Sequence, residues 1–139
     1  MPYRVLISAP YFQPVVDRFE ETFRQHEIEP VVPAVREHLS ESELMDLVGD
    51  IDGAICGDDA FTARVLAEAP RLRVISKWGT GIDSIDREAC AERNVIVCNT
   101  PDAFSQPVAD TTLGYMLFLV RQLDRLSENM RAGRWEKQV

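Results

Sequence analysis

The sequence lacks the features that mark nucleic-acid-binding, membrane and secreted proteins. Lysine and arginine total 15 against 23 aspartates and glutamates, and the resulting net charge of −8 disfavours binding to nucleic acid or to anionic lipid. The longest apolar run, from Leu113 to Val120, is far shorter than the roughly 20 residues that cross a bilayer. The start of the chain, Met1 to Arg4, has no apolar segment of the kind that leads a secreted protein. We therefore expect a soluble, cytoplasmic protein without nucleic-acid or membrane partners.

Cysteine and histidine, which bind transition metals and act as nucleophiles, are also few. The three cysteines, Cys56, Cys90 and Cys98, show no C-x-x-C spacing, and each lies within or beside an apolar run. We therefore expect three small buried side chains with free thiols, which suit a reducing cytoplasm. The two histidines, His26 and His38, fall at the end of an expected helix and in a loop, where we expect ordinary surface residues. The sequence accordingly predicts no metal site.

The first hundred residues contain an alternation of β-branched runs with amphipathic helical patterns. We predict strands over 3–8, 28–32, 51–56, 72–76 and 95–98, separated by helices over 13–26, 40–49, 62–69 and 85–93. Ser40 and Glu43 form a capping box, Asn94 suits a left-handed helix end, and Pro30 places its strand at a sheet edge. Such alternation is typical of an α/β protein with a mostly parallel, doubly wound sheet, and fold analogy favours the flavodoxin-like strand order.

The pattern changes after residue 101, so we divide the chain into a domain over 1–101 and a segment over 102–139. We predict one long helix in this segment, from Ser105 as N-cap to about residue 130, with Pro107 and Asp110 favourable near its start. Its middle is apolar on every side. The apolar residues are Leu113, Tyr115, Met116, Leu117, Phe118, Leu119 and Val120. A helix that is apolar all round must be covered all round, and the five-strand domain covers only one side. We therefore expect a second domain or a second subunit to cover the other.

The most informative segment is the loop over 76–86, which follows a predicted strand and precedes a predicted helix. It therefore lies at the carboxyl edge of the sheet, where α/β proteins bind ligands. Gly79 and Gly81 let successive N–H groups face an anion and Lys77 adds a cation, so the pattern favours a site for a small carboxylate. The alternative is a tight turn without a ligand. Two positions remain open for the Trp78 side chain: it either lines the cleft or packs beneath the loop.

A wider set of residues resembles the D-isomer-specific 2-hydroxyacid dehydrogenases. The matching segments are Leu72-Arg73-Val74-Ile75-Ser76, Gly79-Thr80-Gly81-Ile82-Asp83, Ile85-Asp86, Val95-Ile96-Val97-Cys98-Asn99-Thr100-Pro101 and Val108-Ala109-Asp110. The tail from Ser127 to Lys137, with Gly133-Arg134-Trp135-Glu136, is most similar to phosphoglycerate dehydrogenases. The resemblance implies an oxidoreductase that transfers hydride between NAD or NADP and a D-2-hydroxy acid or its 2-keto acid.

The same resemblance assigns roles to individual residues. The substrate carboxylate would be bound by the loop residues Lys77, Trp78, Gly79, Thr80 and Gly81. Thr80, together with Thr112 in the long helix, would face the cofactor. The first hundred residues would form most of a flavodoxin-like substrate domain, and the helix between Leu113 and Leu123 would pack against its counterpart in a homodimer.

Departures from the family pattern limit what this chain does alone. No G-x-G-x-x-G follows a strand, so the pyrophosphate site of the cofactor is missing. The family's catalytic arginine, glutamate and histidine would lie beyond residue 139, so we expect no catalytic residue here and no activity of the chain alone. The acids of Cys56-Gly57-Asp58-Asp59 replace a more basic stretch and disfavour a phosphorylated substrate. Asp83 and Asp86 are expected to serve in loop hydrogen bonding and helix capping.

An alternative from a different class remains open at this point. It is a stand-alone module that binds a small carboxylate, or dimerises through the long helix, without catalysis. A response-regulator-like signalling domain shares the fold, but Ser8-Ala9-Pro10 offers no acidic pocket after the first strand.

Overall fold

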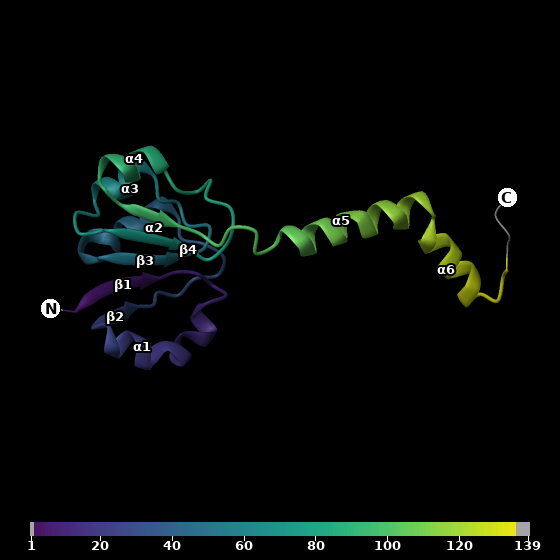
Figure 1. The fold of residues 1–139 in the computed structure, drawn as a ribbon, viewed down its shortest axis with the longest axis horizontal. Coiled ribbons are helices and arrows are strands. Elements are labelled where there is room, and N and C mark those ends of the chain that lie inside the picture. The colour runs from purple at the N-terminus through teal and green to yellow at the C-terminus, as the bar shows by residue number, and fades with distance from the viewer. Residues whose placement is uncertain (1, 136–139) are drawn as a thin grey trace. The chain divides into compact units, whose positions relative to one another are not determined.

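The computed structural model describes residues 2–135, and the chain divides into two compact units (Figure 1). Unit 1 comprises Met1–Pro101 and unit 2 comprises Asp102–Val139. The segment Gly133-Arg134-Trp135-Glu136, which resembles phosphoglycerate dehydrogenases, ends outside the described residues. No helix in the described part of the chain is long and apolar enough to cross a membrane.

Unit 1 is built on a five-stranded sheet in which every neighbouring pair of strands is parallel. The strands are β1 (Tyr3–Ile7), β2 (Ile28–Val31), β3 (Gly53–Cys56), β4 (Val74–Lys77) and β5 (Ile96–Cys98). Their order is β2-β1-β3-β4-β5, which confirms the predicted α/β, doubly wound, flavodoxin-like sheet. Pro30 lies in the edge strand β2, as predicted, because proline cannot donate to a second neighbour.

One face of the sheet carries the larger core. The helices α2 (Glu41–Met45), α3 (Ala63–Ala67) and α4 (Arg87–Glu92) pack there against side chains of β1, β3 and β4. Leu44, Phe61 and Ile75 are fully buried in this cluster. Burying one such side chain contributes about 1.5–3 kcal/mol, so this layer supplies most of the apolar stabilisation of unit 1.

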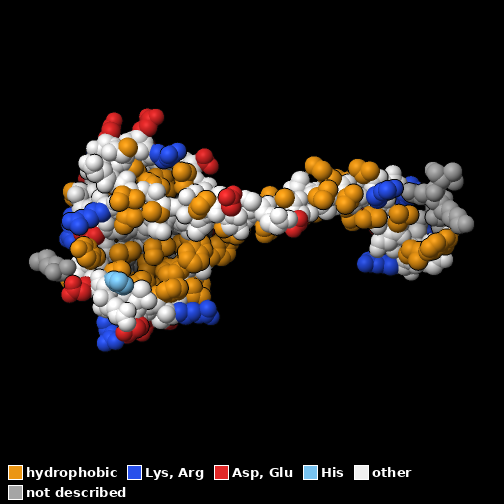
Figure 2. All heavy atoms as spheres, in the orientation of Figure 1, with side chains coloured by type: hydrophobic (Ala, Val, Ile, Leu, Met, Phe, Trp, Pro, Cys, Tyr) orange, Lys and Arg blue, Asp and Glu red, His pale blue; other side chains and the backbone are white. Residues whose placement is uncertain are grey.

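The opposite face of the sheet is only partly covered. The 3-10 helix η1 (Gln13–Phe19) and α1 (Glu20–Gln25) bury Ile7, Phe12 and Phe23 over the β1 and β2 side. Val74 and Ile96, which are partners in the β4–β5 register, stay 36% and 63% exposed. Figure 2 shows hydrophobic side chains on the surface of unit 1. Within unit 1, β4 and the edge strand β5 therefore lack a helical layer on this face.

Several helix boundaries differ from the prediction. The expected helix over 13–26 is η1 followed by α1, and Pro14 lies at the start of the 3-10 part. The capping box of Ser40 and Glu43 is present, but α2 ends at Met45 instead of reaching Gly49. The Leu47 N–H donates to the Leu44 carbonyl at 2.9 Å, an i to i−3 bond that tightens the chain into a 3-10 turn, η2 (Val48–Asp50). That turn places Val48 in the core.

The caps around α4 follow the prediction more closely. Asp86 is the N-cap, and its carboxylate accepts the Ala89 N–H at 2.9 Å. Asn94 takes a φ of 57°, the left-handed conformation expected after the helix.

Unit 2 consists of two helices where one was predicted. α5 (Ser105–Val120) and α6 (Leu123–Arg131) are separated by Gln122, whose left-handed φ of 49° ends the helical path. The prediction of Ser105 as N-cap is also wrong, because Phe104 holds that position and the Ser105 hydroxyl lies 3.2 Å from the Asp102 carboxylate. The first turn of α5 contains no acid, and Asp110 instead accepts a hydrogen bond from Gln106.

Candidate functional site

The loop after β4 has a backbone that favours glycine at one position. Gly79 has a φ of 156°, and a Cβ there would lie 3.3 Å from Cε of Lys77. Before it, the Trp78 N–H donates to the Cys56 carbonyl at 2.8 Å, which continues the β3–β4 pairing by one residue. Any side chain at Gly79 would therefore crowd the end of the strand.

The same loop is tied to the segment that follows β5. The Thr100 N–H donates to the Gly79 carbonyl at 3.0 Å, and the Thr80 hydroxyl donates to the Thr100 carbonyl at 3.1 Å. The Asn99 side-chain amide donates to the Thr80 carbonyl at 2.8 Å. These bonds hold the loop by its carbonyls and by one hydroxyl.

The N–H groups of the loop remain available. Across residues 2–135, the amides of Gly79, Thr80 and Gly81 find no acceptor in the protein. Gly81 is exposed, and a Cβ there would meet only the Asp83 carboxylate, at 3.7 Å. Successive backbone N–H groups without acceptors form a concavity that favours an anion.

The same three residues line a pocket of about 470 Å³. Its walls come from loops that follow β1, β2, β3 and β4, so it occupies the carboxyl edge of the sheet. The lining residues outside the glycine-rich loop are Ala9, Pro10, Tyr11, Arg36, Glu37, His38, Gly57 and Asp58. All five predicted substrate-loop residues, from Lys77 to Gly81, line this one pocket.

The Lys77 ammonium is buried and paired, so it does not project into the pocket as a free cation. The Lys77 side chain is only 4% exposed, its ammonium donates to the Gly57 carbonyl at 2.6 Å, and it forms an ion pair with Asp58. The Asp58 side chain is 84% exposed. The positive charge that the sequence brings to the pocket is therefore largely neutralised by a carboxylate on the neighbouring strand end.

The second acid of this stretch has a structural position. Asp59 is fully buried, and its carboxylate accepts hydrogen bonds from the Ser8 hydroxyl at 2.6 Å, from Leu39 N–H at 2.5 Å and from Gly57 N–H at 2.9 Å. It joins Ser8, just after β1, to Leu39, just before α2. The predicted effect of the two acids on phosphorylated substrates therefore depends on Asp58.

The cysteines show which thiols are chemically available. Burial, assisted by the charge of Asp59, raises the pKa of the Cys56 thiol to about 12, so this thiol stays protonated. Burial, with a smaller contribution from Asp86, also raises the pKa of Cys90. Cys98 is exposed, which contradicts the prediction of three buried cysteines. It is exposed because it belongs to β5, the outer strand that lacks cover.

Trp78 satisfies both of the alternatives left open for it. Its ring centroid lies 5.0 Å from that of Phe12, so one side of the indole packs within the molecule. The side chain is 47% exposed and lines the pocket.

Arg36 and His38, which also line the pocket, were missed as site residues. They lie in an irregular loop after β2, and only their position after a strand's carboxyl end signals them.

The two residues predicted to face the cofactor lie in different units of the chain. Thr80, the first predicted cofactor contact, already donates its hydroxyl proton to Thr100. Thr112 lies in α5 of unit 2, and its hydroxyl donates to the Val108 carbonyl at 2.8 Å. A search of the described residues finds no group of histidine, cysteine, aspartate or glutamate side chains that fits a metal ion.

Comparison with known proteins matches nearly the whole chain. The family model described as "D-isomer specific 2-hydroxyacid dehydrogenase, catalytic domain" matches residues 5–132. D-3-phosphoglycerate dehydrogenase of Methanocaldococcus jannaschii is 31% identical over 135 residues, which cover 96% of this chain and 24% of that protein. Hydroxypyruvate reductase of Thermotoga maritima is 32% identical over 104 residues, which cover 74% of this chain and 34% of that protein.

Solved structures give the same result. NADPH-dependent glyoxylate/hydroxypyruvate reductase of Sinorhizobium meliloti, solved in complex with NADP and malonate, is 26% identical with a TM-score of 0.68. The match covers 97% of this chain and 40% of that one. The chain thus spans less than half the length of these relatives. By the family match over residues 5–132, the chain belongs to the D-isomer specific 2-hydroxyacid dehydrogenases, within their catalytic domain.

Proposed function

We propose that this chain supplies the substrate-carboxylate site of an NAD(P)-dependent D-2-hydroxyacid dehydrogenase. The observation that carries the proposal is the run of backbone N–H groups without acceptors at Gly79, Thr80 and Gly81, three residues that line a pocket of about 470 Å³. Fixed N–H donors suit a carboxylate because the loop is already held by its carbonyls and reorganises little on binding. The substrate is a small 2-hydroxy acid or the corresponding 2-keto acid.

Charge around the loop supports a small monoanionic group at this position. Lys77 contributes a positive potential, but Asp58 offsets it, so the amides carry most of the attraction. Trp78 forms a rigid apolar wall because Phe12 packs against it. A carboxylate held by the amides is thus oriented with its 2-carbon toward the open side of the pocket.

The cofactor, NAD or NADP, supplies the hydride chemistry when bound. Thr80 and Thr112 are proposed to contact it, each through the lone pairs of a hydroxyl whose proton is already donated within the protein. These contacts are too few to hold a dinucleotide, so we propose that the chain alone has no dehydrogenase activity. A steady-state assay with NADH and glyoxylate or hydroxypyruvate tests this, and turnover by the pure chain would contradict it.

The partner of α5 is proposed to be a second copy of the chain. None of the residues of α5 is buried, and Tyr115, Leu119 and Val120 are 67%, 72% and 80% exposed. Figure 2 shows hydrophobic side chains along α5. A helix with this surface gains free energy when another apolar surface covers it, and a homodimer covers both copies at once.

The carboxylate proposal is tested by removing one donor. Gly81→Pro removes the N–H, whereas Gly81→Ala keeps it and meets only the Asp83 carboxylate at 3.7 Å. In an NMR titration with oxalate, we expect saturable shifts of the Gly79, Thr80 and Gly81 amides in the wild type and in Gly81→Ala. Binding should weaken at least about tenfold in Gly81→Pro, as for loss of one charge-assisted hydrogen bond.

Two results would count against the proposal. One is an equal affinity of both variants for oxalate, given matching thermal unfolding curves that show both to be folded. The other is a set of oxalate-induced shifts that leaves the amides of the loop over 78–83 unchanged.

A further inference from the structure

A second pocket lies at the opposite edge of the sheet, where the strands begin. Its volume is about 550 Å³. Three arginines line it: Arg71 and Arg73 in the segment that leads into β4, and Arg93 at the end of α4. Tyr3, at the start of β1, and Asn94 complete the polar part of the wall. This pocket shares no lining residue with the glycine-rich loop.

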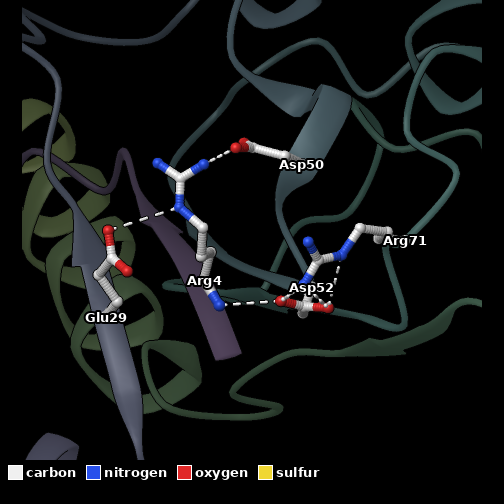
Figure 3. Close-up of polar contacts among 5 residues, drawn as sticks. All are labelled: Arg4, Glu29, Asp50, Asp52 and Arg71. Carbon is white, nitrogen blue, oxygen red and sulfur yellow. Dashed lines mark hydrogen bonds and ion pairs between the residues drawn. The ribbon is translucent and has the colours of Figure 1, made fainter. Parts of the chain in front are cut away.

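One of the three guanidinium groups is fixed by a buried carboxylate. Asp52 is 9% exposed and accepts hydrogen bonds from the Arg4 backbone N–H at 2.9 Å and from Arg71 Nη2 at 2.8 and 3.0 Å (Figure 3). Burial by itself raises the pKa of this carboxyl, but the Arg4 N–H and the Arg71 guanidinium outweigh it and hold the pKa below its ordinary value. Asp52 therefore stays charged and anchors Arg71 in one orientation.

The neighbouring Arg4 side chain serves a different purpose. Its guanidinium forms ion pairs with Glu29, at 3.5 Å, and with Asp50, as Figure 3 shows. Its charge is thereby neutralised locally.

Arg73 and Arg93 have no such partners. Within residues 2–135, neither guanidinium donates a hydrogen bond to the protein or forms an ion pair. The positive charge of Arg73 also helps to lower the pKa of Asp52, which places the two side chains within electrostatic reach of each other. With three arginines and one aspartate, the pocket carries a formal charge of about +2, in a chain whose net charge is −8.

We infer that this pocket is a binding site for a small phosphate-bearing anion, independent of the proposed dehydrogenase function. Guanidinium groups bind phosphate oxygens through paired N–H donors, and an excess of positive charge in the pocket attracts an anion that carries several negative charges. Arg71 supplies a preorganised anchor, and Arg73 and Arg93 supply the two uncompensated charges. Tyr3 is 49% exposed and adds a hydroxyl and a ring face at the rim.

The probe is inorganic pyrophosphate, titrated into the 139-residue chain at constant ionic strength and followed by NMR. We expect saturable shifts centred on the amides of Arg73, Arg93 and Asn94. Oxalate at a concentration that saturates the glycine-rich loop should leave this affinity unchanged, which separates the two sites.

A matched pair of variants makes the test specific. The double variant Arg73→Gln/Arg93→Gln removes the two unpaired charges and should weaken pyrophosphate binding at least about tenfold. Arg18→Gln removes an exposed charge in η1, outside the pocket, and should leave binding unchanged. Equal weakening in both variants, shifts confined to Gly79, Thr80 and Gly81, or a titration that never saturates would each overturn the inference.

Discussion

The two units of this chain use apolar residues in opposite ways. In unit 1, side chains such as Phe61 and Leu44 are fully buried between the sheet and its helices. In unit 2, the structure records no buried residue in α5 or α6, although α5 contains three leucines, two valines, a tyrosine, a methionine and a phenylalanine. Unit 1 therefore carries its stability within itself, whereas α5 has the surface of a helix that is stabilised by association.

The largest expected effect comes from a pair of identical substitutions, one in each unit. Phe61→Ala empties a fully buried position and should lower the free energy of unfolding by about 3–5 kcal/mol. Phe118→Ala, at a side chain that is 41% exposed, should change it by less than about 0.5 kcal/mol at low protein concentration. Urea unfolding followed by circular dichroism measures both values.

The same pair of variants can be compared by a second measurement, the monomer–dimer equilibrium, in which Phe118→Ala should have the larger effect. In sedimentation velocity, Phe118→Ala should shift a homodimer toward monomer, and a wild-type chain that stays monomeric at high concentration would contradict the proposed α5 interface. Equal unfolding free energies for the two variants would contradict the contrast between the units.

The next effect probes the buried hydrogen bonds of Asp59. In Asp59→Asn, either orientation of the new amide places its NH₂ group against a backbone donor, Leu39 N–H or Gly57 N–H. A buried donor then loses its acceptor, which should lower the free energy of unfolding by about 1–3 kcal/mol. Asp17→Asn is the matched control, because that side chain is exposed and makes no hydrogen bond or ion pair within residues 2–135, so its loss should cost less than about 0.5 kcal/mol. A cost for Asp59→Asn no greater than that of the control would show that Asp59 is not structural.

A smaller effect is expected from Asp52, and it depends on pH. The pKa of this carboxyl is lowered in the folded chain, so its stabilisation is present above the unfolded pKa of about 3.9 and is lost as the pH falls through the folded value. Asp52→Asn should therefore unfold at nearly the same urea concentration as the wild type under strongly acidic conditions and at a lower one at pH 7. A difference that persists unchanged to low pH would contradict this assignment.

The last effect changes reactivity without changing stability. Ellman's reagent at pH 8 should modify Cys98 rapidly, because it is exposed, and leave Cys56 and Cys90 unmodified in the folded chain. In denaturant all three thiols should react. Cys98→Ser should abolish the rapid phase, and a rapid phase that survives this substitution would place the accessible thiol elsewhere.

The sequence was sufficient for the sheet and its larger core because these depend on local patterns. Strand–helix alternation predicted the parallel order, and Ser40, Asp86 and Asn94 marked helix ends through interactions with their own neighbours in the chain. The glycine-rich loop was recognised for the same reason. Gly79 and Gly81 carry no side chain, so their residue type alone was enough to predict a loop whose backbone is open to a ligand.

Features set by contacts between distant segments escaped prediction. The ion pair of Lys77 joins β4 to the end of β3, and no local pattern shows that Asp58 neutralises it. The arginine pocket unites Arg73 with Arg93, which are 20 residues apart, on two different elements. The break between α5 and α6 depends on a glutamine in the left-handed conformation, a residue that gives no signal of the kind glycine gives.

The most direct test of the central claim is the size of the protein in its source cells. An antibody raised against this chain should detect a polypeptide of more than twice 15.7 kDa, with room for a dinucleotide-binding domain. That result would agree with the match to a solved relative, of which this chain covers 40%, and with the proposed role of the chain in binding the substrate. A single band at 15.7 kDa, without a copurifying dinucleotide-binding protein, would contradict the dehydrogenase function.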